Sequence, residues 1–597
     1  MKSYSYKTYK LIISMILLMF ISSTYAGTSC RCKPNQDCWP KKILWDNLRE
    51  SMDGKLFQGV SYLKECIDAP KSEACETLLS QTTNPFYLEE QPTATQSTGW
   101  FKAWENTPSN YVAEVMNAQD IAKVVKFAKQ HNIKIVIKGT GHDYLGRNNA
   151  PDSILIWTHQ MRATQMHTKF IPHGCSEEHT NLQSLSVQAG TRWLEAYDMA
   201  TNKHNRYVQG GGCTSVGAAG GFVQGGGYGS LSRQYGSGAS GVLEFEVIIA
   251  NGDIVIANEC QNQDLYWALK GGGGSTFGVV SKIVYMTHPS SITSGIVSGE
   301  IKANSDAAFL KIISKLMNVY KNNFVNAHWG EMIKIKSNNT ISLALVYRDL
   351  KKPDVELILS PLKELADEND DINFKVDVNP IDAVKMWDPD YMEKSLGIVV
   401  KDTRSNQPQN QYWWKGDGGQ VSMFWHEYQS TYLPKSLLED NNIDSFAKAL
   451  FDASRFHQLD IHINKGLYGS AHDAQERQKN TSMTPKALDA IGLLLITSGE
   501  ARTYPNIIGK EPNLEKANVL VENGHKAMKI IKDIAPNAGS YANEASYFQE
   551  NWQEEFWGDN YDKLFDIKNK YDPNGLFFCH QCVGSEIWSD DGMCKKK

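Results

Sequence analysis

The sequence lacks the features by which nucleic-acid-binding and membrane-spanning proteins are usually recognised. Its 597 residues carry 61 Lys and Arg against 67 Asp and Glu, a net charge of -6, and no run of five or more basic residues occurs. An overall positive field that would attract nucleic acid is therefore missing. Beyond the N-terminus, no apolar run approaches the roughly 20 residues that a membrane-spanning helix needs. We expect neither a nucleic-acid partner nor a membrane-spanning segment in the mature chain.

The two commonest phosphate-binding motifs are also missing. No Walker sequence ending in Gly-Lys-Ser/Thr occurs. One Gly-x-Gly-x-x-Gly run, at 236–241, stands before a predicted strand, whereas a Rossmann fingerprint follows a strand and opens a helix. A bound phosphate would therefore need another glycine geometry, such as a concave nest of consecutive backbone N–H groups.

An export signal is predicted at the N-terminus. Residues 1–26 place three lysines before an apolar core at 11–21, and small residues precede a cut at Gly27. The alternative, an uncleaved signal anchor, fits less well because the core is short for a membrane span. We expect a secreted protein, or one in the lumen of the secretory pathway, whose sequons at Asn338 and Asn480 are glycosylated if exposed.

The cysteines lie mainly near the two ends of the chain, as disulfides of a secreted protein would. The eleven occupy positions 30, 32, 38, 66, 75, 175, 213, 260, 579, 582 and 594. Zinc half-sites at Cys30-x-Cys32 and Cys579-x-x-Cys582 are the alternative, which an oxidising compartment disfavours, and we predict no metal. The odd count leaves one cysteine over, and Cys213 is isolated in a glycine-rich stretch.

Glycine is concentrated at 210–229, which reads GGGCTSVGAAGGFVQGGGYG, with a smaller partner at 139–146, GTGHDYLG. Glycine allows the backbone to approach another group closely. The cysteine, tyrosine and branched apolar residues among the glycines do not suit a flexible linker. The two stretches therefore predict a buried, flat ligand that bears phosphate.

The periodicity of apolar residues predicts an alternation of strands and helices. Asn251-Gly252 is a strong hairpin signal. From about residue 289 the glycines thin out, and helical patterns alternate with strands as in a separate α+β domain. We expect strands at 112–116, 133–137, 154–157, 185–188, 242–250, 254–257, 278–285 and 340–347. We expect helices at 118–131, 193–203 (capped by Thr191), 306–324 and 354–366 (kinked or split at Pro361).

Three short runs resemble one known family. GTGHDY at 139–144, CTSVG at 213–217 and GGGYG at 225–229 are similar to the FAD-linked oxidases of the berberine bridge enzyme-like group, which share the vanillyl-alcohol-oxidase (PCMH-type) flavin fold. The phrases CRCKPNQDCWP, LIWTH, SYANEASYF and YDPNGLFF resemble its fungal isoamyl-alcohol-oxidase-like branch. The resemblance covers nearly the whole mature chain.

The resemblance implies an α+β fold: a PCMH-type FAD-binding domain of two α/β subdomains plus an α+β substrate domain with an antiparallel sheet. The boundaries expected are a signal peptide at 1–26, a cysteine-bearing segment at 27–104, the FAD-binding domain at 105–288, the substrate domain at 289–535 and a C-terminal segment at 536–597 that returns to the FAD domain.

The resemblance also assigns two covalent links to the flavin. His142 would bond to the 8α-methyl carbon and Cys213 to C6, and a thiol among backbone N–H donors is expected to be partly ionised. The alternatives are an ordinary core histidine and an ordinary buried thiol. One residue more than the family pattern separates Cys213 from Tyr228. The remaining cofactor-contacting residues implied are Gly139, Thr140, Gly141, Val216, Gly217, Gly225, Gly226, Gly227 and Asn543.

Four residues are candidates for proton transfer. Tyr228 would need a strongly depressed pKa to act as a base, and packing is the alternative role. The alternation at 457–464 puts Asp460 and His462 on one polar strand face, which looks either onto the flavin or into solvent. Tyr541 is a candidate by resemblance.

Val216 matches a position that controls access of oxygen in the family, and a plain core role is its alternative.

The function implied is that of a secreted FAD-dependent oxidase, which removes hydride from an alcohol or carbohydrate hydroxyl and reduces O2 to H2O2. The alternatives are a flavin dehydrogenase, an oxidase that forms C–C or C–N bonds in a secondary metabolite, and a secreted binding protein on a degenerate flavin fold. A small alcohol, a sugar and a secondary metabolite all remain open as substrate.

Overall fold

A four-stranded sheet forms the first part of the chain. The computed structural model describes residues 30–596 except 177–181, 292, 406 and 408–409, so the expected signal at 1–26 lies outside the described residues. The strand order is β1-β4-β6-β5, in which β4 and β5 run parallel to β6. The strands are β1 (Lys55–Gln58), β4 (Tyr111–Glu114), β6 (Ser153–Trp157) and β5 (Lys134–Lys138).

Helix α6 (Ala118–Gln130) joins β4 to β5, as predicted from the sequence. The Asn117 side chain accepts a hydrogen bond from the N–H of Asp120 and so caps the first turn. The spacing of Ile121, Val124 and Val125 buries one face of the helix in the core with the sheet.

A second, antiparallel sheet follows in the order β11-β10-β12-β8-β7, with β9 paired to β12. The predicted hairpin is confirmed, because β10 and β11 pair across Asn251-Gly252 and Gly252 has a φ of 82°. The strands are β7 (Thr164–Phe170), β8 (Leu182–Gln188), β9 (Arg206–Val208), β10 (Val242–Ile248), β11 (Ile254–Asn258) and β12 (Val279–Pro289).

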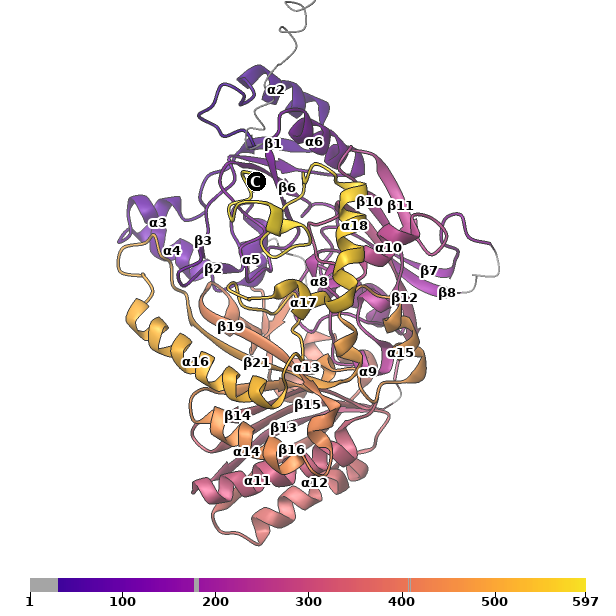
Figure 1. The fold of residues 1–597 in the computed structure, drawn as a ribbon, viewed down its shortest axis with the longest axis vertical. Coiled ribbons are helices and arrows are strands. Elements are labelled where there is room, and N and C mark those ends of the chain that lie inside the picture. Colours follow the sequence, from indigo (N-terminus) through magenta and orange to yellow (C-terminus); the bar gives the residue numbers. More distant parts are fainter. Residues whose placement is uncertain (1–29, 177–181, 292, 406, 408–409, 597) are drawn as a thin grey trace, which may run out of the picture.

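A nine-stranded sheet dominates the rest of the molecule (Figure 1). Its order is β16-β13-β15-β14-β20-β21-β19-β2-β3, antiparallel throughout except where β19 pairs with β2. Its strand β2 thus comes from the cysteine-bearing N-terminal segment, and β3 begins at the last residue of that segment. The strands are β2 (Ser97–Trp100), β3 (Trp104–Glu105), β13 (Ser294–Ala303), β14 (Trp329–Lys336), β15 (Thr340–Arg348), β16 (Ile372–Ile381), β19 (Met423–Pro434), β20 (Leu459–His462) and β21 (Ala490–Ala501).

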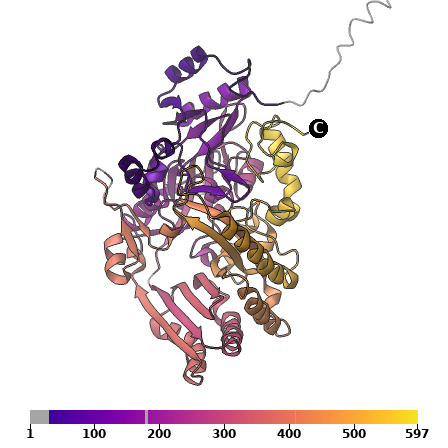
Figure 2. The same cartoon turned by 90° about the vertical axis from the view of Figure 1, so that its left-hand side faces the viewer.

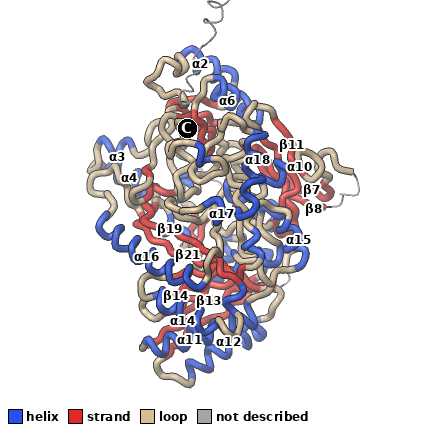
Figure 3. The backbone as a smooth tube through the Cα atoms, viewed as in Figure 1, coloured by secondary structure: helices blue, strands red, loops and turns tan. Residues whose placement is uncertain are grey.

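Four helices cover one face of this sheet, where they lie outside the strands in Figure 3. Alternate residues of the central strands, among them Ile333, Ile461 and Leu494, pack with these helices in one buried cluster. The opposite face is therefore the one turned toward the glycine stretches. The helices are α11 (Asp306–Val319), α12 (Lys352–Asp367), α14 (Ile443–Ser454) and α16 (Leu514–Ile534).

The C-terminal helices return to the first half of the chain, where Figure 2 shows them in yellow beside its purple strands. Helices α17 (Trp552–Trp557) and α18 (Tyr561–Tyr571) share a buried cluster with β10 and β12. No helix among the described residues is long and apolar enough to cross a bilayer.

Three sequence-based expectations about local structure are wrong. Arg192, not Thr191, precedes helix α7 (Trp193–Tyr197), because the Glu195 carboxylate accepts the backbone N–H of Arg192. Helix α12 continues through Pro361, so it is not split there, and the strand expected at 457–464 is limited to β20 because the chain turns into a short 3-10 helix after His462.

Disulfides account for ten of the eleven cysteines, and Cys213 is free. The zinc half-sites considered above are excluded, since both motifs are oxidised. The pairs are Cys30–Cys594, Cys32–Cys38, Cys66–Cys75, Cys175–Cys260 and Cys579–Cys582.

Removing the Cys30–Cys594 disulfide should destabilise the protein more than removing Cys32–Cys38. The two bonds span 564 and 6 residues, and the chain-entropy model puts the difference at about 4 kcal/mol. Urea unfolding of the two Cys→Ser double variants measures the free energies. An equal loss in both would contradict the entropic explanation.

Candidate functional site

The two glycine stretches, about 70 residues apart in sequence, meet in the fold. The first follows β5 and the second follows β9. A Cβ atom at Gly217 would lie 3.5 Å from Thr140 Oγ1, and His142 Nε2 is 2.9 Å from Ser215 Oγ. The structure thus brings the candidates of the first stretch against those around Cys213.

The first stretch presents consecutive free N–H groups. The amides of residues 140–144 have no acceptor among the described residues. Gly141 has a φ of 88°, and the Asp143 carboxylate shapes the loop by accepting the N–H groups of Leu145 and Arg147 at 2.9 Å each. Consecutive amides without acceptors are what an anion nest for phosphate would require in the absence of a Walker or Rossmann motif.

His142 is poised as a neutral nucleophile. Burial lowers the pKa of its imidazole to about 4, so the ring is uncharged near neutrality. The Ser215 hydroxyl is hydrogen-bonded to Nε2 of His142, while Nδ1 has no hydrogen-bond partner in the part of the chain that the structure describes. When Nε2–H donates to Ser215, Nδ1 keeps its lone pair for bond formation.

Cys213 is held in a loop, and its thiol is protonated. Burial, followed by the charge of Asp417, raises the thiol pKa well above its ordinary value. The thiol pKa moves opposite to the direction expected for a partly ionised thiol, because burial and the nearby carboxylate both favour the protonated form. Val216 follows in the same turn, where its N–H reaches the carbonyl of Cys213 at 3.3 Å, and it packs partly buried against the neighbouring core.

The GGGYG run packs against the C-terminal SYANEA phrase. The N–H of Gly227 donates to Tyr541 Oη at 2.9 Å, and Asn543 Nδ2 donates to Tyr541 Oη at 3.0 Å. The N–H groups of Gly225 and Gly226 donate to nearby carbonyls, each at 2.9 Å. All three glycine amides thus have partners within the protein, and these glycines serve close packing.

The two tyrosine candidates lack the condition that a base requires. Tyr228 Oη is 2.9 Å from Tyr432 Oη, and burial raises the pKa of Tyr228 well above its ordinary value. Burial and the charge of Glu544 raise the pKa of Tyr541 as well. Both phenols are therefore protonated in this state of the protein.

Asp460 and His462 lie on the sheet face opposite the helices. Their cross-strand neighbours on that face include Leu493 and Leu495, which pack in one cluster with Tyr228. Asp460 Oδ2 is 3.5 Å from Lys334 Nζ. Burial, with nearby lysine charges, lowers the pKa of His462 well below its usual range, so the imidazole is neutral.

Three charged residues near the site had no signal in the sequence patterns. Lys465 Nζ lies 2.6 Å from both oxygens of Glu544. Glu331 accepts a hydrogen bond from Ser230 and takes a φ of 73° within β14, a conformation that costs free energy for a residue other than glycine. Because these contacts span more than 75 residues, local periodicity could not predict them.

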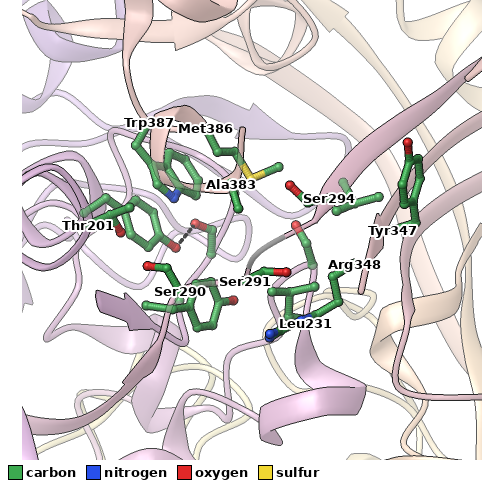
Figure 4. A pocket seen from close by; sticks show the side chains of 17 residues that line it. Thr201, Leu231, Ser290, Ser291, Ser294, Tyr347, Arg348, Ala383, Met386 and Trp387 are labelled. Atoms are coloured by element: carbon green, nitrogen blue, oxygen red, sulfur yellow. Dashed lines mark hydrogen bonds between the residues drawn. The ribbon is translucent and has the colours of Figure 1, made fainter. Parts of the chain in front are cut away.

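A cavity lies beside the second glycine stretch, between Gly210–Gly212 and the ends of β13 and β15. Figure 4 shows Trp387 and Met386 across it from Ser291 and Leu231. Trp387 stacks on Tyr197 with ring centroids 3.7 Å apart. The opening is thus partly aromatic and partly lined by hydroxyl groups.

Comparisons with known proteins fit this arrangement. Residues 109–258 match a family model described as FAD binding domain, and 540–584 match one described as Berberine and berberine like. The FAD-linked oxidoreductase easE of Epichloe festucae var. lolii is 30% identical over 610 residues, covering 96% of this chain and 93% of its own.

Two solved structures are similar. The VAO-type flavoprotein MtVAO615 of Myceliophthora thermophila C1 is 25% identical with a TM-score of 0.76, covering 95% of this chain and 100% of its own. A glucooligosaccharide oxidase of Acremonium strictum, whose structure is described with a 6-S-cysteinyl, 8α-N1-histidyl FAD, is 20% identical with a TM-score of 0.61, covering 88% of this chain and 99% of its own.

Gly225→Ala should disrupt the junction of the glycine stretch with the C-terminal phrase. The new Cβ would lie 2.1 Å from Asn543 Oδ1, and such overpacking typically costs about 1–3 kcal/mol. We expect a lower midpoint of thermal unfolding and less bound FAD, measured by absorbance of the purified protein. Gly220→Ala is the matched control because no atom lies within 4 Å of its Cβ; equal effects in both would refute the packing argument.

Proposed function

The chain belongs to the berberine bridge enzyme-like FAD-linked oxidoreductases, and we propose that it is an exported oxidase which takes hydride from an alcohol or carbohydrate hydroxyl and passes the electrons to O2. FAD is its cofactor and oxidoreduction its chemistry. Export is supported by the five disulfides and by the exposure of both Asn338 and Asn480.

The observation that carries the proposal is the pairing of one free thiol with one neutral imidazole in adjoining loops. His142 with its open Nδ1 and Cys213 with its unpaired sulfur match, in residue type, the two attachments named for the Acremonium enzyme. The amides of 140–144 would hold phosphate oxygens of the same cofactor. Bound FAD supplies hydride acceptance and the reduction of O2.

Ser215 has a positioning role in this proposal. Its hydroxyl takes the Nε2 hydrogen of His142 and so selects the tautomer whose Nδ1 is nucleophilic. A histidine without this partner would divide its hydrogen between the two nitrogens, and the reactive form would be less populated.

Covalent attachment is tested by acid precipitation. The wild-type pellet should be yellow, and a colourless pellet would remove the covalent-flavin proposal. His142→Ala should lose the histidyl link while Cys213 still retains flavin, and Ser215→Ala should slow formation of the link without changing the fold. Absorbance of the denatured protein measures attached flavin, and thermal unfolding serves as the control for folding.

His462 is the residue that we favour as acceptor of the substrate's hydroxyl proton. Its imidazole is neutral, it has no hydrogen-bond partner among the described residues, and it shares a sheet face with residues that pack on Tyr228. Asp460 is the second candidate, although it already forms an ion pair with Lys334. Tyr228 and Tyr541 would first have to lose tightly held protons.

Stopped-flow measurement tests both the base and the oxidant. A screen of alcohols and oligosaccharides for peroxide release first identifies a substrate. His462→Ala should then slow flavin reduction by roughly 10²–10⁴-fold, whereas His457→Ala, just before β20, should not. An unchanged rate in His462→Ala would shift the assignment to Asp460.

Rapid reoxidation of the reduced flavin by O2 is expected with Val216 in place, and slow reoxidation would favour the dehydrogenase alternative.

A further inference from the structure

The loop that carries Cys213 is fixed from both sides by one short strand. Trp414 Nε1 donates to the carbonyl of Gly212 at 2.8 Å, and the hydroxyl of Thr214 donates to the carbonyl of Tyr412. Both partners belong to β18 (Tyr412–Trp414). The position of Cys213 relative to β18 is therefore set by the residues immediately before and after it.

Asp417 begins the 3-10 helix that follows β18, and its carboxylate faces the thiol of Cys213. Its Oδ2 is buried without a hydrogen-bond partner among the described residues. The other charged groups that act on the thiol are Glu331, which raises its pKa, and Lys465, which lowers it. Asp417 is the carboxylate that acts most strongly on the thiol, and its Oδ2 is free to accept a proton.

A protonated thiol is a poor nucleophile, because the thiolate is the reactive form. Cys213 cannot supply a thiolate by itself, since burial and two carboxylates hold its proton. We propose that Asp417 is the general base that removes the Cys213 proton when the sulfur bonds to flavin C6. This inference rests on the proposed function, and it gives Asp417 a role in forming the covalent bond between Cys213 and the flavin.

The overall reaction is balanced with O2 as oxidant. The Cys213 S–H and flavin C6–H bonds break, one S–C6 bond forms, and the two hydrogens with two electrons leave as H2O2. Asp417 accepts the thiol proton and later releases it. Burial raises the pKa of Asp417 to about 6, so the carboxylate form needed for this step prevails near neutrality and is lost as the pH falls below that value.

Counting free thiols tests the inference without any measurement of enzyme activity. Ten cysteines are in disulfides, so an alkylating dye added in urea without reductant reports on Cys213 alone. Wild-type protein should show no free thiol, and Asp417→Asn should show about one per chain while His142 still holds flavin. In air-saturated buffer near neutrality, thiol loss in Asp417→Asn should be at least about 100-fold slower, and alkaline pH should restore it by ionising the thiol directly.

Glu331→Gln is the matched control, because it removes a nearby negative charge without removing the proposed base. It should retain the thioether. Asp417→Glu keeps a carboxylate and should retain partial linkage, which provides a measurement if Asp417→Asn is not secreted.

The outcomes separate the two proposals. A linked Cys213 in Asp417→Asn, or no linkage in Asp417→Glu, overturns the role of Asp417. A free Cys213 in wild-type protein that still holds flavin also overturns it, but leaves an oxidase attached through His142. Wild-type protein without any flavin refutes the proposed function, and the inference with it.

Discussion

Close backbone approach at a few glycines holds the molecule together where its sheets meet. A Cβ atom at Gly330 would lie 1.8 Å from the carbonyl oxygen of Ser230, and one at Gly229 would lie 1.9 Å from that of Gly210. Side chains at these positions would separate β14 from the glycine stretch. Because both sides of the candidate site are built on these contacts, its geometry depends on them.

Arg233 adds polar bonds to this steric junction. Fully buried and five residues after Tyr228, it donates to the carbonyls of Gly466, Phe324 and Ile491. A buried guanidinium with carbonyl partners is costly to remove, since each carbonyl would lose its donor. The Arg233 side chain therefore holds the glycine stretch and the segment that carries Lys465 in fixed positions relative to each other.

The residue types at the site could be predicted because glycine, histidine and cysteine occur there in short, dense runs. The helix-covered face of β20 also followed from simple alternation, since Leu459 and Ile461 are both buried. The Lys465–Glu544 pair and the left-handed Glu331 could not be predicted. Their positions follow from the packing of segments far apart in sequence, and each is a single polar residue among ordinary neighbours.

Cys213 shows why local sequence can mislead about reactivity. Three glycines precede it, and backbone N–H groups close to a thiol would favour the thiolate. The fold instead buries the thiol and places two carboxylates near it, Glu331 on β14 and Asp417 after β18, and together these raise its pKa. Reactivity at this sulfur is thus controlled by residues about 120 and 200 positions away in sequence. Since those residues reach Cys213 only when β14 and β18 dock on the glycine stretch, the chemistry of the thiol is coupled to completion of the fold.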